Sequence, residues 1–80
     1  MWYYMIKYSF DSTKVIKGPF KTENEAYQAM QHCANEEYRI CTEENEWDSE
    51  IYKKKDAGEI TIISYFDADM DVTEFFIFEI

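Results

Sequence analysis

Three aspartates at alternate positions in "DADMDVTEFFIFEI" have the type and spacing that could do chemistry. Carboxylates at the first, third and fifth positions of a twelve-residue calcium loop converge on one hard cation, and Asp67, Asp69 and Asp71 share that spacing. The second half of such a loop is missing, because Val72 stands where glycine is needed and Phe78 where a bidentate glutamate is needed. We therefore expect no metal site. Two uses of the aspartates stay open: a solvated hairpin turn, or a negative surface for a positively charged partner.

Other reactive residues do not form a catalytic constellation. The one histidine, His32, is predicted on the exposed side of a helix, and its neighbour Cys33 diverges from it by about 100°, so the two cannot chelate one metal ion. Gly18 and Gly58 are the only glycines, too few for a loop that cradles phosphates. No serine or cysteine lies in a nucleophile elbow. We expect neither an enzyme nor a cofactor.

The composition is typical of one small packed domain spanning residues 1–80. Apolar residues make up 46% of the chain and aromatic residues 19%, which argues against disorder despite the net charge of −9. Cys33 and Cys41 are expected in one helix about 12 Å apart along its axis, too far for a disulfide. Two free thiols indicate a reducing compartment, so the expected location is cytoplasmic.

The charge is concentrated in two short segments. The chain has 17 acidic residues against 8 basic ones, so direct binding to nucleic acid is not expected. One acidic segment is "EENEWDSE", and the other holds the three aspartates described above. A concentrated negative surface attracts basic partners, and an aromatic side chain within it can anchor the contact. The candidate partner-binding residues are Glu43, Glu44, Glu46, Trp47, Asp48, Glu50, Asp67, Asp69 and Asp71.

The elements that position these residues follow from the apolar pattern. Alternation predicts a strand at residues 2–10, and "TKVIK" (13–17) predicts a short second strand that the following Gly-Pro pair ends. Thr22 followed by Glu25 fits a capping box at the start of a helix. An apolar stripe at three- and four-residue steps predicts that this helix lies across a sheet; its members are Ala26, Tyr27, Met30, Ala34, Tyr38 and Cys41.

The second half of the chain is predicted as a short helix and two strands. Residues 47–57 have the order of charges and the glycine stop of a short helix, with a structured loop over 42–58 as the alternative. Residues 59–66 and 72–80 are β-branched and aromatic, which favours strands. The expected fold is therefore α+β: a four-stranded antiparallel sheet with one long helix on one face, in the order β-β-α-(short α)-β-β.

The last strand has apolar residues on both faces. Phe76, Phe78 and Ile80 point to one side and Phe75 and Ile77 to the other. This indicates a central strand, or a face that a second protein covers.

The position of residues 42–58 decides whether the two acidic segments meet. If residues 47–57 run back along the sheet, the acidic run 43–50 and the Asp67 to Asp71 turn reach the same end of the domain. If residues 42–58 stay at one end as a loop, the two segments lie at opposite ends.

The overall profile resembles that of small acidic inhibitor proteins of phages and mobile elements, among them anti-CRISPR proteins and DNA mimics. The stretches "TEENEWDSE" and "DADMD" carry this resemblance. It implies a non-enzymatic inhibitor that docks a negative patch on the basic, nucleic-acid-binding surface of a larger protein, with no membrane and no direct nucleic acid as partner. The alternative is a small structural or regulatory homodimer with the apolar C-terminal strand as its interface.

Overall fold

The structure, a computed structural model, describes all 80 residues. It contains one long helix, five strands and two short helical turns. In chain order these are β1 (Trp2–Tyr8), β2 (Lys14–Phe20), α1 (Glu23–Arg39), the π-helical turn η1 (Ile40–Glu44), β3 (Asp48–Lys54), the 3-10 turn η2 (Lys55–Ala57), β4 (Glu59–Phe66) and β5 (Asp69–Glu79).

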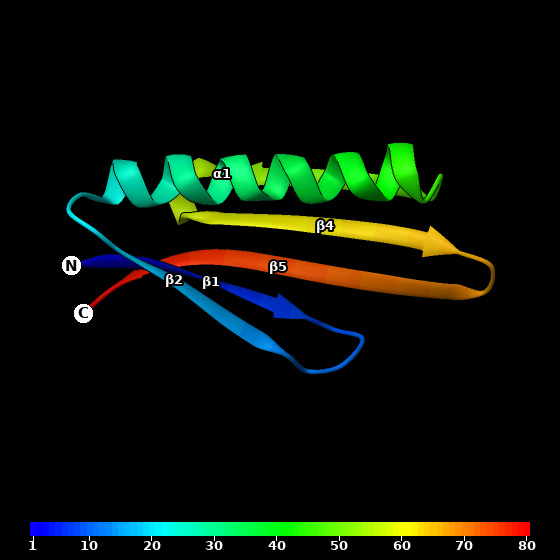
Figure 1. Ribbon diagram of the computed structural model, residues 1–80, viewed down its shortest axis with the longest axis horizontal. Helices are drawn as coiled ribbons and strands as arrows, with labels where there is room; N and C mark the ends of the chain where they lie inside the picture. The colour runs from blue at the N-terminus through cyan, green and yellow to red at the C-terminus, as the bar shows by residue number, and fades with distance from the viewer.

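The five strands form one antiparallel sheet in the order β2-β1-β5-β4-β3. Helix α1 lies along one face of this sheet, and both chain termini lie at the end where the helix begins (Figure 1). The predicted α+β class, the single long helix and the central position of the last strand are confirmed. The predicted number of four strands is wrong, because β3 adds a fifth.

The predicted short helix at residues 47–57 is in fact strand β3 followed by η2. Trp47 and Ile51 are four residues apart, which suggested a helix, but Ile51 pairs with Ile62 of β4 and packs on the core. The edge of β4 supplies backbone partners along the whole of β3, and this tertiary pairing outweighs the local helical pattern. The acidic residues Asp48 and Glu50 therefore lie on a strand.

The Gly18-Pro19 pair lies inside β2, where the sequence predicted an end. Proline is tolerated there because β2 is an edge strand, with no neighbour on its outer side. Gly18 has a φ of 140°, and a Cβ atom on it would lie 2.6 Å from Cδ2 of Tyr3. Only glycine fits this close approach of an aromatic ring. Strand β2 passes through the Gly-Pro pair and ends at Phe20.

Helix α1 begins as the capping box predicted, since the backbone N–H of Glu25 donates to Oγ1 of Thr22 at 3.1 Å. Its first four stripe residues are buried, whereas Tyr38 and Cys41 are half-buried. Cys41 lies beyond the helix in η1, and both cysteines are free thiols, as expected.

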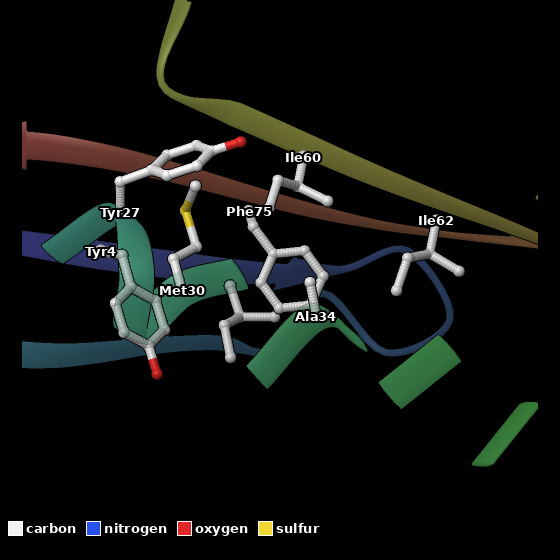
Figure 2. Close-up of a cluster of buried hydrophobic side chains, with 8 residues drawn as sticks. Tyr4, Tyr27, Met30, Ala34, Ile60, Ile62 and Phe75 are labelled. Atoms are coloured by element: carbon white, nitrogen blue, oxygen red, sulfur yellow. The ribbon is translucent and has the colours of Figure 1, made fainter. Parts of the chain in front are cut away.

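The core lies between α1 and the sheet, as Figure 2 shows. Met30 and Ala34 of the helix face Phe75 of the central strand, and all three are at most 1% exposed. The other buried members of the cluster are Tyr4, Ile6, Tyr27, Ile60 and Ile62. This single core fixes the sheet against the helix, and the ends of the elements carry the candidate site.

Candidate functional site

The structure brings the two acidic segments to the same end of the molecule. Asp48 at the start of β3 pairs with Tyr65 of β4, and Tyr65 pairs with Met70 of β5. Neighbouring strands are about 4.8 Å apart, so the Cα atoms of Asp48 and Met70 are separated by about 10 Å. In Figure 1 the end of α1 and the β4–β5 turn lie together at the right. We call this end, formed by residues 43–50 and 67–71, the acidic end.

The carboxylates of the acidic end lie on both faces of the sheet. Directly paired residues share a face, so Asp48 and Glu50 lie on the face away from α1, where Tyr65 and Ile63 lie. Asp71 pairs with the buried Ser64 and lies on the helix side. Trp47 and Asp71 are half-buried, and the other seven candidate residues are exposed.

The three alternate aspartates do not form one ladder. Asp69 and Asp71 belong to β5 and share a face, but Asp67 lies in the two-residue β4–β5 turn with a left-handed φ of 52°. Aspartate tolerates this conformation better than most residues. In the structure, no group of three or more His, Cys, Asp or Glu side chains is placed to hold a metal ion.

Arg39 at the end of α1 neutralises part of the acidic end. Its guanidinium lies 2.6 Å from Oε1 of Glu36, 3.5 Å from Oε2 of Glu43 and 2.9 Å from Oε2 of Glu44. The hydrogen bond from Arg39 lowers the pKa of Glu36, and the bonds to Glu36 and Glu44 raise the pKa of Arg39. Two of the candidate carboxylates are thus already paired. The spacing of three and four residues that separates Arg39 from Glu36 and Glu43 is typical of ion pairs on a helix, so the sequence carried a signal for these pairs.

An aromatic contact holds residues 45–47, the segment between η1 and β3, against the β4–β5 hairpin. The rings of Trp47 and Phe66 stack with their centroids 4.6 Å apart. The backbone N–H of Trp47 donates to the carbonyl of Cys41 at 2.9 Å, and the hydroxyls of Ser49 and Ser64 are 3.0 Å apart. These contacts fix the position of Glu46 and of Asp48, the first residue of β3.

Exposed apolar side chains lie among the carboxylates. Tyr65 is 42% exposed and Met70 56% exposed, and both lie on the face away from α1 beside Asp48. Tyr52 donates its hydroxyl hydrogen to Glu50, which raises the pKa of Tyr52. Tyr65 and Met70 were not predicted as site residues, because their exposure depends on which face of the sheet α1 covers.

The basic residues gather mainly at the other end. Lys53 and Lys54 end β3, and Lys55 lies 5.9 Å over the ring of Tyr27, one turn into α1. Lys21 precedes the helix, and Lys17 pairs with Tyr4 in the same half of the sheet. That end also carries five carboxylates, so its charges nearly cancel; they are Glu23, Glu25, Asp56, Glu59 and Glu79. The net negative charge is therefore concentrated at the acidic end, and the charge is polarised along the longest axis of the molecule, which is 41 Å long.

None of the helices combines the length and the apolar character needed to cross a membrane. Comparisons of the chain with protein-family models, with curated proteins and with solved structures find no match.

Proposed function

We propose that this chain is a non-enzymatic binding protein that docks its acidic end on a basic surface of a larger protein. The observation that supports this most directly is the pairing of Asp48 with Tyr65 and of Tyr65 with Met70, which joins two acidic segments about 20 residues apart in the sequence. A dense group of carboxylates on a fixed framework raises the local potential and steers a basic partner into contact.

The carboxylates of the acidic end that do not pair with Arg39 are the proposed contacts. Arg39 already pairs with Glu43 and Glu44, so these two contribute less. The remaining carboxylates are Glu46, Asp48, Glu50, Asp67, Asp69 and Asp71. Trp47, Tyr65 and Met70 add apolar surface, which charged rims by themselves lack and which tight interfaces use as anchors.

The proposed partner is a protein that binds nucleic acid, because a surface built for phosphates also accepts a fixed array of carboxylates. In this respect the chain resembles anti-CRISPR proteins and DNA mimics of phages and mobile elements. Its polarised charge limits the mimicry to one end of the molecule. The proposed site of action is the cytoplasm, since Cys33 and Cys41 are free.

The test is capture of partners from a bacterial lysate with two matched triple variants. Asp67→Asn, Asp69→Asn and Asp71→Asn together neutralise three carboxylates of the acidic end. Glu23→Gln, Asp56→Asn and Glu79→Gln together neutralise the same number at the opposite end. Both variants have the same net charge, so a general charge effect changes both equally.

We expect the opposite-end variant to capture the same proteins as the wild type and the acidic-end variant to lose them. Capture should also weaken as the salt concentration rises from about 0.05 M to about 0.5 M, because exposed charges are screened. Equal capture by both variants would show that the acidic end is not the contact.

A further inference from the structure

Strand β3 has an outer edge that no other strand of the chain covers. The sheet order β2-β1-β5-β4-β3 makes β2 and β3 the two edge strands. An edge strand presents unpaired backbone N–H and C=O groups, and these groups can pair with a strand of another protein. The outer edges of β2 and β3 are therefore the two places where an extended segment of a partner can add to this sheet.

The alternation of hydrogen bonds identifies the backbone groups of β3 that point outward. The N–H of Ile77 in β5 donates to the carbonyl of Gly58, directly before β4, at 3.0 Å. Successive residues of a strand direct their backbone groups to opposite sides, so the even-numbered residues of β4 bond to β5 and the odd-numbered ones bond to β3. Their partners in β3 are Asp48, Glu50, Tyr52 and Lys54. The N–H and C=O groups of Ser49, Ile51 and Lys53 therefore point away from the sheet.

The edge of β3 is regular, whereas the edge of β2 is interrupted. The pairing of β3 with β4 runs without a shift from Asp48 to Lys54. In β2, Gly18 has a φ of 140° and Pro19 has no N–H to donate, and the register with β1 shifts in the same part of the strand. The edge of β3 therefore offers the longer continuous run of backbone groups to an added strand.

The side chains of β3 show what kind of segment fits this edge. Asp48 and Glu50 are exposed on the face away from α1, and the residues of an added strand opposite them lie on that same face. Ile51 lies on the helix side, where it packs on the core. Lys53 and Lys54 end the strand, so basic residues fit only beside its first half. The best complement is an extended segment with two basic residues at alternate positions and an apolar residue opposite Ile51.

The charge of the chain favours a basic partner at this edge over a second copy. Each copy has a net charge of −9, so two copies repel each other at long range, whereas a basic segment is attracted. The edge is also continuous with the acidic run 43–50, which leads directly into β3.

We propose that an extended basic segment of the partner adds to the edge of β3 as a further strand, antiparallel to β3. This inference rests on the proposed function, because it describes how the acidic end holds its partner. The basic side chains pair with Asp48 and Glu50, and the backbone of the segment bonds to both groups of Ile51 and to the N–H of Ser49. The carbonyl of Ser49 already accepts the hydroxyl hydrogen of Tyr38 at 3.4 Å. In this mode of recognition the backbone bonds supply affinity and the alternate side chains supply specificity.

The first test uses the synthetic peptide acetyl-Thr-Val-Arg-Ser-Arg-Thr-amide as the added strand. Its antiparallel register places the valine opposite Ile51 and the two arginines opposite Glu50 and Asp48. Isothermal titration calorimetry with the wild-type protein should give a Kd below about 1 mM. Absence of binding at that concentration would overturn the proposal.

Two N-methylated forms of the peptide separate strand addition from charge attraction. N-methyl groups on the valine and the serine remove the donors that face β3, whereas N-methyl groups on the two arginines remove donors that face away from it. Both forms have the same charge. We expect the first form to bind at least about tenfold more weakly than the second. Equal affinities would overturn the strand addition, while the capture experiment with the two triple variants tests the proposed function separately.

Amide hydrogen exchange, followed residue by residue by NMR, locates the peptide on the protein. In the free protein the N–H groups of Ser49 and Ile51 should exchange quickly, and the peptide should slow their exchange. The N–H groups of Lys14 and Ile16, which point outward from β2 by the same alternation, are the control and should not change. Slower exchange at β2 and not at β3 would overturn the assignment of the edge. Exchange of Ser49 and Ile51 that slows with rising protein concentration alone would assign the edge to a second copy and overturn the proposal equally.

Discussion

The ring of Trp47 stacks on that of Phe66 with the centroids 4.6 Å apart and the planes 27° from parallel. Trp47 lies between η1 and β3, within the acidic run 43–50, and Phe66 is the last residue of β4 before the turn that holds Asp67. The contact therefore joins two segments whose charges repel each other. An apolar attraction at this place keeps the carboxylates together before any partner arrives, so the ordering cost of binding is reduced.

Separate and combined alanine substitutions of Trp47 and Phe66 measure this contact. We expect a coupling free energy of about 0.5–1.5 kcal/mol in a double-mutant cycle from chemical denaturation, as for other aromatic pairs. Trp47→Ala combined with Phe20→Ala is the control, since Phe20 stacks on Tyr4 in another part of the sheet. Those two changes should be additive within about 0.5 kcal/mol. Full additivity for Trp47 and Phe66 would show that the contact does not hold the loop.

Phe75 and Phe76 are neighbours on the central strand but face opposite sides. Phe75 is 1% exposed and lies under α1, whereas Phe76 is half-buried on the face of the sheet away from α1. Phe75→Ala should lower the free energy of unfolding by about 3–5 kcal/mol, because it leaves a cavity in the core. Phe76→Ala should cost less than half as much, because its removal leaves no enclosed cavity. Similar losses at both positions in urea denaturation would contradict this assignment of faces.

Gly58 ends the η2 turn in a left-handed conformation with a φ of 65°. A Cβ atom on this residue would lie 2.5 Å from Cγ1 of Ile77. Gly58→Ala should therefore destabilise the protein by at least about 2 kcal/mol, from the left-handed backbone and the steric overlap together. Ala57→Gly, one residue earlier and exposed, should cost no more than about 1 kcal/mol. Thermal unfolding of the two variants measures the difference in stability, and equal shifts in Tm would contradict the prediction.

Burial, with a further contribution from the thiol of Cys33, raises the pKa of Tyr4 to about 12. The folded state therefore favours the neutral phenol. The stability from this group is fully present below the ordinary pKa near 10.0 and is lost as the pH rises through about 12. The free energy of unfolding should fall across this window, and Tyr4→Phe should reduce the slope. Denaturant titrations at several pH values measure the free energy of unfolding. If its slope against pH were the same in Tyr4→Phe as in the wild type, the assignment to Tyr4 would be contradicted.

Local signals in the sequence were sufficient to predict α1, β4 and β1, although β1 ends at Tyr8 and not at residue 10 as predicted. The hydrogen bond between Thr22 and Glu25 involves residues three apart, and the buried stripe of α1 depends only on the helical period. Strand β3 was not predicted because its alternation is weak and Ile51 is its one apolar core residue. Its conformation depends on the free edge of β4, which exists only once the sheet has formed.

The acidic end was predicted as a possible arrangement, and its details depend on tertiary structure. The antiparallel return of β3 brings Asp48 beside the β4–β5 hairpin, as a returning helix would also have done. The pairing of Arg39 with Glu44 arises because η1 continues the helix as a wider π turn, with a hydrogen bond from the N–H of Asn45 to the carbonyl of Ile40. No periodicity in the sequence indicated that turn.

The central claim is that the acidic end occupies a surface that otherwise binds nucleic acid. Its most direct test is fluorescence anisotropy of labelled duplex DNA bound to a purified partner obtained by capture. The wild type and the opposite-end variant (Glu23→Gln, Asp56→Asn, Glu79→Gln) should displace the DNA with equal midpoints. The acidic-end variant (Asp67→Asn, Asp69→Asn, Asp71→Asn) should need at least about tenfold more protein, about 1.4 kcal/mol of lost binding free energy. A complex that holds DNA and this protein together, or equal midpoints for both variants, would contradict the claim.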